Sequence, residues 1–363
     1  MSTRFMLFSL LFVSWMLPSN SFLDACTGIK LVSQDGTTVH GRTLEFGLKV
    51  ELSAVVVPRK FQFTGTTPKG PGLTYKAKYG SVGMMAFDNP AILDGLNEKG
   101  LAVGTFYFPG FAEYPTITAE NQFKALSPAE FPNWILTQFA TIEEVKDNLS
   151  KVVIASTVVA EWGSTAPPFH YVVFDKTGKC LVIEPRKGQL LTYDNPLGVF
   201  TNSPTFEWHM ENLRNYIHLT ALNAKPLQVA GLTLNAFGQG SGMVGMPGDF
   251  TPPSRFVRAA FFSITAMPSP TAKESVGQVF HILNQFDIPL GAVRAEENGV
   301  IHSDYTQCTC VRDPQSLNYY FKTYDNQTIR MVNLNSFDLD AKSIKKMNVA
   351  KEEEYIDLSA QLK

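Results

Sequence analysis

The order of strand-like and helical segments most constrains the fold of this chain. Alternating or apolar runs bounded by turn residues predict early strands at 27–32, 37–45, 50–57, 80–86 and 101–108. Further strands are expected at 170–175, 180–184 and 189–193, and an antiparallel meander at 305–311, 318–323 and 329–333. Capping boxes at 127–130 and 141–144 open helices between these groups, and a second helical block covers 207–222, 254–265 and a helix opened by 271–274. Grouped strands and grouped helices do not suit a βαβ sheet and predict an α+β fold of antiparallel sheets layered with helices.

Composition supports one globular domain without a nucleic-acid surface. Apolar residues make up 44% and charged residues 18% of the 363 residues, which is ordinary for a protein with a large core. The net charge is −2, from 31 basic and 33 acidic residues, and no basic block occurs. No repeat or linker divides the chain, so we expect a single catalytic domain over 26–363.

The first 25 residues have the layout of a secretory signal peptide. Arg4 precedes an apolar stretch at 5–17, polar and helix-breaking residues follow at 18–21, and the small Ala25 stands before Cys26. The apolar stretch is too short to span a membrane. The sequence therefore predicts a signal peptide over 1–25 and an exported mature protein without a membrane span.

Cleavage after Ala25 would make Cys26 the first residue of the mature chain. One residue would then carry both a thiol nucleophile and an α-amine, whose ordinary pKa near ~8 suits a base at neutral pH. Two other interpretations remain open. The run Leu23-Asp24-Ala25-Cys26 resembles a lipoprotein signal, in which the cysteine is lipidated, although Asp24 is unusual there. Cys26 could also be an ordinary buried or disulfide-bonded cysteine.

Other motifs exclude several kinds of site. Cys180, Cys308 and Cys310 form no CxxC pair and the histidines form no HExxH, so neither a metal site nor a cofactor is expected. The GxGxxG match at 240–245 does not open a helix, because Pro247 follows it, and we interpret it as a glycine-rich loop beside a substrate pocket. No GxSxG elbow is present.

Three polar residues are candidates for a site around Cys26. Arg42 and Glu45 end a weakly polar strand-like run; an arginine near a thiol favours the thiolate, and a carboxylate near the amine would orient it. A surface ion pair is the alternative for these two residues. Asn202 ends an apolar run, where it is either a turn or cap residue or an amide donor to an oxyanion.

Several segments together resemble the choloylglycine hydrolase family, which includes bile salt hydrolases and penicillin V acylases. The resemblance runs from Cys26 to about Leu334. It is carried by Cys26-Thr27 and by the segments 41–46, 94–101, 201–204, 247–256, 305–307 and 319–324.

The resemblance implies an N-terminal-nucleophile hydrolase, with two antiparallel sheets sandwiched between helical layers. It implies that Cys26 is the nucleophile and its α-amine the base, that Arg42 lies beside the thiol and that Asn202 holds the oxyanion. Arg255 would order the nucleophile by ionic contacts. Many members carry Asp where this chain has Glu45, so the role of Glu45 in orienting the amine is less certain.

The substrate expected from the resemblance is a small linear amide with an apolar acyl group. We expect Phe46, Met84, Tyr107 and Phe108 to line the acyl pocket. Tyr107 stands where penicillin V acylases tend to have Tyr and bile salt hydrolases Asn, so it favours penicillin V over conjugated bile salts. The leader is typical of the Gram-negative branch, which predicts a periplasmic or secreted bacterial protein and includes acylases of acyl homoserine lactones. The family also implies a homo-oligomer, a tetramer.

Two functions other than amide hydrolysis by an N-terminal nucleophile stay open at this point. A lipid-anchored binding protein would keep the fold and lose the chemistry, because Cys26 would be acylated. A peptidase would pair Cys26 with a distant histidine, although nothing in the sequence pairs a histidine with it.

Overall fold

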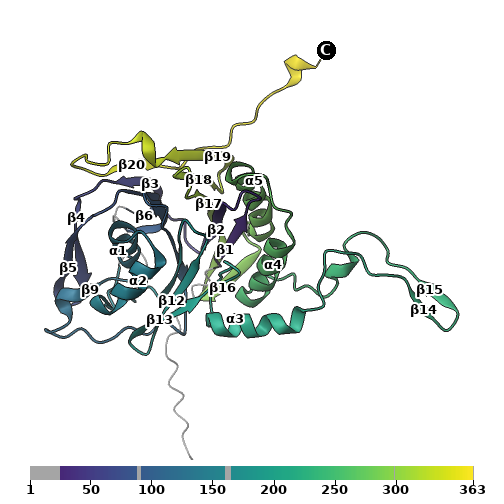
Figure 1. The fold of residues 1–363 in the computed structure, drawn as a ribbon, viewed down its shortest axis with the longest axis horizontal. Coiled ribbons are helices and arrows are strands. Elements are labelled where there is room, and N and C mark those ends of the chain that lie inside the picture. The colour runs from purple at the N-terminus through teal and green to yellow at the C-terminus, as the bar shows by residue number, and fades with distance from the viewer. Residues whose placement is uncertain (1–24, 88–90, 160–164, 298, 363) are drawn as a thin grey trace, which may run out of the picture.

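The computed structural model describes residues 25–87, 91–159, 165–297 and 299–362 (Figure 1). The predicted signal peptide lies outside these residues except for Ala25. Within the described residues, no helix is both long and apolar enough to cross a membrane.

One sheet joins the two ends of the domain. Its strands run in the order β1 (Thr27–Val32), β2 (Thr38–Phe46), β17 (Val300–Asp313), β18 (Asn318–Thr323) and β19 (Asn326–Asn333), and β16 (Val293–Glu297) also pairs with β17. Every pair is antiparallel. The predicted C-terminal meander is therefore confirmed, and it is joined to the N-terminal hairpin through the pairing of β2 with β17.

A second antiparallel sheet faces the first. Its order is β13 (Gln189–Asp194), β12 (Cys180–Arg186), β11 (Phe169–Phe174), β8 (Ala102–Tyr107), β7 (Ile92–Asn97), β6 (Ser81–Ala86), β3 (Leu52–Val57) and β20 (Lys345–Asn348). All residues of β6, β7, β8 and β11 are buried, as expected for strands covered on both faces.

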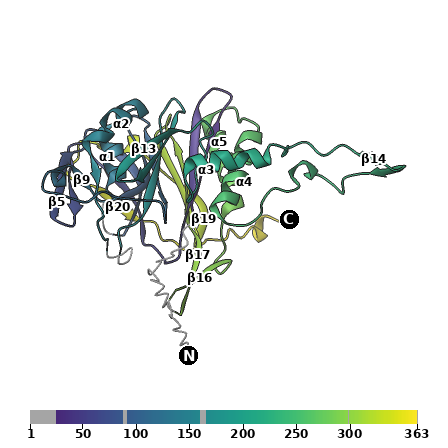
Figure 2. The same ribbon diagram turned by 90° about the horizontal axis from the view of Figure 1, so that it is seen from below.

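Helices cover the outer face of each sheet (Figures 1 and 2). The short α1 (Phe131–Gln138) packs on β7 and β8, and α2 (Ile142–Asn148) lies on the same side. On the other side α4 (Pro252–Thr265) packs on β1, and α5 (Ala272–Leu283) packs on β2 and β17. The resulting helix–sheet–sheet–helix layering confirms the expected fold class.

The close approach of α5 to β2 depends on a glycine. A Cβ at Gly41 would lie 2.4 Å from Val279 Cγ1 and 2.8 Å from Leu283 Cδ1. Such distances are shorter than any normal carbon–carbon contact, so only a residue without a side chain lets the helix sit at this distance.

The helix starts agree with the sequence to within a few residues. At α2 the Thr141 hydroxyl accepts from Glu144 N at 3.2 Å, and the Glu144 carboxylate accepts from Ala140 N. At α1 the Glu130 carboxylate accepts from Ser127 N at 2.8 Å, but regular helix begins only at Phe131. The capping box at 141–144 is thus confirmed, whereas the one expected at 127–130 is wrong in position: only its Glu130–Ser127 contact forms, and the helix follows with Glu130 as its N-cap.

The helix predicted over 207–222 is much shorter. It comprises α3 (Phe206–Asn212) and a 3₁₀ turn (Leu213–Tyr216). After this turn the chain extends away from the two sheets, and we call residues 217–245 the arm (Figure 1). Ile217 and Leu222 are exposed, so no apolar face of this segment packs on the domain. Most helical stability comes from such packing, and the helix therefore ends where packing ends.

Several pairings were not predicted, among them those of β7, β16 and β20 in the two large sheets. The arm carries the hairpin of β14 (Leu227–Val229) and β15 (Leu232–Leu234), and the body carries the hairpin of β4 (Gln62–Thr67) and β5 (Gly70–Lys76). In addition, β9 (Ala125–Leu126) pairs in parallel with β10 (Val153–Ile154), and Gly28 forms an isolated bridge with Phe200.

Candidate active site

Cys26 lies immediately before β1, between the two sheets, and its side chain is held by Arg42. The Cys26 Sγ atom is 2.7 Å from Arg42 Nη2. Arg42 projects from β2, the strand next to β1, where it stands opposite Gly28 in the strand register. The two residues meet because a hairpin brings the start of β1 beside the end of β2.

The guanidinium of Arg42 is fixed on three sides. It donates to Thr105 O at 2.5 Å and to Thr43 O at 3.0 Å, and it lies 4.2 Å from the ring centre of Phe106. Burial opposes its charge, but Coulomb attraction to Cys26 raises its pKa. A permanently charged, buried guanidinium at this distance favours the thiolate form of Cys26.

The backbone of Cys26 is held by Asn202 and Arg255. Cys26 N donates to Asn202 Oδ1 at 2.7 Å, and Cys26 O accepts from Arg255 Nη1 at 2.5 Å. Arg255 also donates to Asn202 Oδ1 at 2.8 Å and to Thr27 Oγ1 at 2.8 Å. Here the nitrogen of Cys26 is the amide that joins it to Ala25; in a chain beginning at Cys26 it would be the α-amine.

Asn202 is itself fixed by its second amide atom. Its Nδ2 donates to Tyr107 O at 2.9 Å, and because an amide nitrogen carries two hydrogens, one donor remains for a substrate oxygen. The expected oxyanion role is therefore compatible with the geometry. The structure adds a second role, because the oxygen of the same amide accepts from the nitrogen of the nucleophile.

Glu45 is buried beside this group but binds Thr306. Its Oε1 accepts from the Thr306 hydroxyl at 2.8 Å, and its Oε2 has no hydrogen-bond partner among the described residues. Burial raises the pKa of Glu45 to about 8, against the opposing effect of the Arg255 charge. The acceptor at Cys26 N is Asn202, and a role for Glu45 in orienting the amine stays a prediction.

A small cavity with a mostly apolar lining adjoins the thiol. Its volume is about 20 Å³, which is room for about one water molecule. It is lined by Cys26, Arg42, Leu44, Glu45, Phe46, Val50, Leu93, Thr105, Tyr107 and Phe169. The ring centres of Phe46 and Tyr107 are 5.9 Å apart, and those of Tyr107 and Phe169 are 5.1 Å apart.

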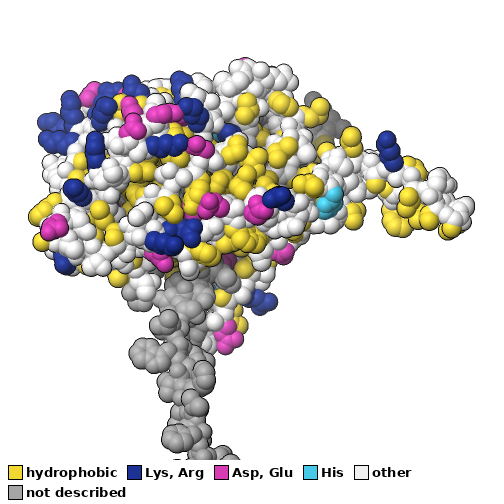
Figure 3. All heavy atoms as spheres, turned by 60° about the horizontal axis from the view of Figure 1, so that its bottom comes forward, with side chains coloured by type: hydrophobic (Ala, Val, Ile, Leu, Met, Phe, Trp, Pro, Cys, Tyr) yellow, Lys and Arg dark blue, Asp and Glu magenta, His cyan; other side chains and the backbone are white. Residues whose placement is uncertain are grey.

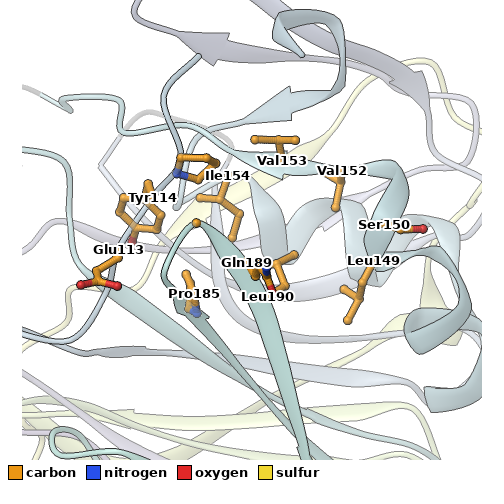
Figure 4. A pocket seen from close by; sticks show the side chains of 12 residues that line it. Glu113, Tyr114, Leu149, Ser150, Val152, Val153, Ile154, Pro185, Gln189 and Leu190 are labelled. Carbon is orange, nitrogen blue, oxygen red and sulfur yellow. The ribbon is translucent and has the colours of Figure 1, made fainter. Parts of the chain in front are cut away.

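A larger cavity lies elsewhere, against the β12–β13 hairpin. It measures about 300 Å³ and is mostly apolar (Figure 4). Its acidic residue, Glu113, accepts from Lys187 N at 2.6 Å. None of the residues that line this cavity is a cysteine or a histidine.

Comparison with known proteins identifies the family. The family model described as "Linear amide C-N hydrolases, choloylglycine hydrolase family" matches residues 26–347. The chain belongs to the choloylglycine hydrolase family. It is therefore an enzyme that hydrolyses linear amide C–N bonds, and the family expected from its motifs is confirmed.

Relatives and a solved structure agree over almost the whole domain. The bile salt hydrolase/transferase of Clostridium perfringens is 34% identical over 320 residues, which cover 88% of this chain and 95% of that protein. The penicillin V acylase of Pectobacterium atrosepticum is 27% identical, over 82% of this chain and 77% of that protein. The crystal structure of a mutant of the conjugated bile acid hydrolase from Clostridium perfringens matches with a TM-score of 0.82 and 33% identity, over 92% of this chain and 100% of that one.

The structure brings together most, not all, of the residues that the sequence nominated in this choloylglycine hydrolase. Cys26, Arg42, Asn202 and Arg255 are linked by direct hydrogen bonds, and Phe46 and Tyr107 line the cavity. Met84 and Phe108 do not line it. Met84 is fully buried in β6, and Phe108 stacks on His170 at 4.2 Å, because successive residues near the end of β8 point to opposite faces.

The glycine-rich loop is also not where it was expected. Residues 240–245 lie on the arm, where Gly242 packs against the backbone of Thr220 and Leu222, and they do not line the cavity beside Cys26. The glycines of this loop shape the backbone of the arm, because Gly240 and Gly245 adopt positive φ values that residues with a side chain rarely adopt.

Some lining residues were not nominated from the sequence. Phe169, Leu93 and Thr105 come from three separate strands, and only the strand register reveals them; Val50 comes from the connection between β2 and β3. Phe169, for example, pairs with Tyr107 across β11 and β8. No local motif marks such a residue, since its neighbours are assembled by topology.

The three other cysteines are buried and play no part in this cavity. Cys180, Cys308 and Cys310 are free thiols, and the Sγ atoms of Cys308 and Cys310 are 3.3 Å apart. Burial raises the pKa of Cys180 well above the ordinary thiol value, which leaves it a poor nucleophile.

Proposed function

We propose that this protein is an N-terminal-nucleophile amide hydrolase in which Cys26 is both nucleophile and base. The observation that carries the proposal is the double anchoring of one residue: Cys26 Sγ lies 2.7 Å from Arg42 Nη2, and Cys26 N lies 2.7 Å from Asn202 Oδ1. The nucleophilic sulfur and the nitrogen that would become the base are thus each held by a separate buried side chain.

In the proposed reaction the Cys26 thiolate attacks the carbonyl carbon of the substrate amide. The protonated α-amine gives its proton to the leaving nitrogen, the C–N bond breaks, and a thioester remains on Cys26. Water then attacks the thioester, the α-amine accepts a proton from that water, and the carboxylic acid leaves. The second N–H of Asn202 stabilises the oxyanion in both steps. No cofactor takes part in this scheme.

We infer that the substrate is a conjugated bile salt, penicillin V or a related N-acyl compound. The lining of Phe46, Tyr107 and Phe169 supports an apolar acyl group. The bile salt hydrolase/transferase relative is more similar to this chain than the penicillin V acylase relative, whereas Tyr107 favours penicillin V. Values of kcat/KM for glycocholate, taurocholate, penicillin V and an acyl homoserine lactone would rank the candidates; a larger value for glycocholate than for penicillin V rejects the inference from Tyr107.

We also propose that the mature chain is exported and begins at Cys26. The signal-peptide layout of 1–25 and the family match that starts at residue 26 support this proposal. A free α-amine is needed because the nitrogen of an amide is not basic.

We propose a homo-oligomer, with the family's tetramer as the expected size. The arm supports it, because the arm projects from the body and exposes apolar side chains that no described residue of the same chain covers (Figures 1 and 3). These residues are Ile217, Leu222, Leu227, Val229, Leu232, Leu234, Phe237 and Val244. Exposed apolar groups of this extent are typical of interfaces between proteins.

Substitution of the nucleophile tests the mechanism. Cys26→Ala should lower turnover by at least ~10³-fold, as removal of other catalytic nucleophiles does. The variant must be produced with the chain beginning at residue 26 and checked by intact mass. Near-normal activity of that processed variant would reject Cys26 as the nucleophile.

A further inference from the structure

Two buried histidines contact the backbone of the segment that carries Asn202. His170 Nε2 is 3.1 Å from Thr201 O, and His209 Nε2 is 2.9 Å from Asn202 O. The two rings are 0% and 1% exposed. Because a backbone carbonyl oxygen can only accept, each Nε2 must carry a hydrogen and donate it.

The surroundings keep both rings neutral in this tautomer. Neither Nδ1 atom has a hydrogen-bond partner among the described residues. Burial lowers the pKa of both histidines, that of His209 to about 4. The Glu184 carboxylate, whose Oε1 lies 3.9 Å from His170 Nδ1, favours a cation at His170, but burial has the larger effect on its pKa. The charge of Arg255 disfavours a cation at His209.

Ring stacking fixes the direction in which each Nε2 points. His209 stacks on Phe256 with ring centres 4.7 Å apart and planes 11° apart, and Phe256 follows Arg255 in α4. His170 stacks on Phe108 at 4.2 Å and 11°. His170 lies in β11 and His209 lies in α3, so each donor belongs to a regular element. The ring of His209 also contacts α4, the helix that carries Arg255.

The other side of the segment is held by β1. Gly28 N donates to Phe200 O at 2.7 Å, and Phe200 N donates to Gly28 O at 3.0 Å. The backbone of Phe200 is thus tied to β1, the strand that begins directly after Cys26. The carbonyls of Thr201 and Asn202 need donors of their own, and the two histidines supply them.

We propose that His170 and His209 are positioning residues of this amide hydrolase, which fix the backbone of Asn202 and thereby aim its amide at Cys26. The inference rests on the proposed role of Asn202 and extends it to two residues that do not touch the substrate. A shift of Asn202 by a fraction of an ångström would misalign both the nitrogen of Cys26 and the oxyanion donor, and such misplacements are costly in rate.

His209→Phe tests the proposal because it keeps a flat ring on Phe256 and removes the donor. We expect kcat for penicillin V and glycocholate to fall by roughly 10-fold, as for loss of one hydrogen bond of ordinary strength, with KM within ~2-fold. His209→Gln retains a donor and should recover part of the loss. Unchanged kcat in His209→Phe would overturn the proposal.

His40→Phe is the matched control. His40 is also fully buried and stacked, with its ring 4.2 Å from that of Phe174, but neither of its nitrogens has a hydrogen-bond partner among the described residues. We expect its kcat to stay within ~2-fold of the wild type. A loss equal to that of His209→Phe would show that any buried histidine matters equally and would overturn the proposal.

A double-mutant cycle separates positioning from a general structural effect. If His209 acts through Asn202, then His209→Phe should cause no further loss in kcat when Asn202 is already Ala. A further ~10-fold loss in that background would contradict the inference. Full activity of Cys26→Ala or of Asn202→Ala would instead reject the proposed function itself, so the two failures are distinguishable.

The tautomers can be read without any substitution. Nitrogen-15 spectra of the histidine-labelled wild-type protein at pH 7 should show the neutral Nε2–H tautomer for His170 and His209. An Nδ1–H tautomer at either residue would overturn the proposal, because its Nε2 could not donate.

Discussion

At the scale of single residues, two arginines have different tasks around Cys26. Arg42 contacts the sulfur, whereas Arg255 contacts the backbone oxygen of Cys26 and the amide of Asn202. Burial lowers the pKa of Arg255 to about 10, so it stays charged at neutral pH. In the proposed mechanism the first arginine would favour the thiolate of Cys26, and the second would hold the backbone of the same residue in position.

Arg42→Gln should reduce the reactivity of the thiol without unfolding the domain. Gln cannot supply the positive charge that favours the thiolate, so we expect alkylation of Cys26 by iodoacetamide at pH 7 to slow by roughly 10-fold, as for a shift of about one unit in the thiol pKa. Peptide mapping of the modified cysteine measures this rate. An unchanged rate would show that the thiolate is stabilised by another group.

Asn202→Ala should lower kcat by roughly 10²-fold or more, because it removes an oxyanion donor and the acceptor at Cys26 N. Steady-state kinetics with penicillin V or glycocholate, together with a melting curve, measure the effect. A rise in KM alone would make Asn202 a substrate contact and place the oxyanion donors elsewhere.

The buried Glu45 should make stability depend on pH. Its pKa is about 8 in the folded protein and near 4.5 ordinarily, so the folded state holds a proton that the unfolded state releases between these values. This contribution to stability is complete below about pH 4.5 and is lost as pH rises towards 8. Asp304, whose pKa burial raises to about 7, acts in the same direction.

Glu45→Gln should therefore flatten the pH dependence of stability. Free energies of unfolding in urea at pH 5 and pH 8 should differ less in the variant than in the wild type. Equal differences in the two proteins would mean that Glu45 is already ionised at pH 5.

At the scale of elements, the N-terminal hairpin and β17 do most to build the site. β2 brings Arg42 beside Cys26, and its pairing with β17 places Thr306 opposite Glu45. α5 covers these strands closely because Gly41 has no side chain. The site thus depends on how tightly one helix packs on the sheet behind it.

Gly41→Ala should destabilise the protein by about 2 kcal/mol, because the new Cβ would overlap Val279 and Leu283. Gly277→Ala, in α5, is the matched control. Nothing lies within 4 Å of its Cβ position, so the same change there should stabilise the helix by about 0.5–1 kcal/mol. Urea unfolding of both variants tests the pair, and equal effects would contradict the packing argument.

The sequence predicted those elements whose patterns are local. The strands β2, β8 and β11 and the capped α2 lie close to their expected positions. The β4–β5 hairpin was missed because its threonines and glycines lack a strong apolar alternation. The helix expected over 207–222 was too long because its second half has nothing to pack against.

The site was predictable where a motif carried it. Cys26, Arg42, Asn202 and Arg255 each stand in a family segment, and the structure joins them by hydrogen bonds. Phe169 and the histidines at 170 and 209 carry no such mark, because their proximity to the site results from strand pairing and from the placement of α3. Met84 was expected to line the acyl pocket, but its side chain in β6 is buried in the core.

At the scale of the whole molecule, the arm stands out because many of its apolar side chains are exposed in a single chain. Phe237 and several aliphatic side chains on it are exposed, and the β14–β15 hairpin touches no other strand in the described chain. The catalytic layers, by contrast, are complete without it. This contrast supports a role for the arm in contacts between copies of the chain.

Deletion of the arm should therefore change assembly more than chemistry. A variant with residues 224–239 replaced by a short Gly-Ser linker should shift from oligomer to monomer in light scattering coupled to gel filtration, because it removes most of the exposed apolar side chains of the arm. An unchanged oligomer would contradict the proposed role of the arm, and so would a wild type that is already monomeric.

In the proposed mechanism the active enzyme begins at an unmodified Cys26. Intact mass spectrometry of an active, exported preparation tests it most directly, combined with peptide mapping of the N-terminus. We expect a mass equal to Cys26–Lys363 with a free α-amine, because only a free amine can serve as the base. A fully active preparation that retains Ala25, or one whose Cys26 carries an acylated amine and a lipid adduct, would contradict the mechanism.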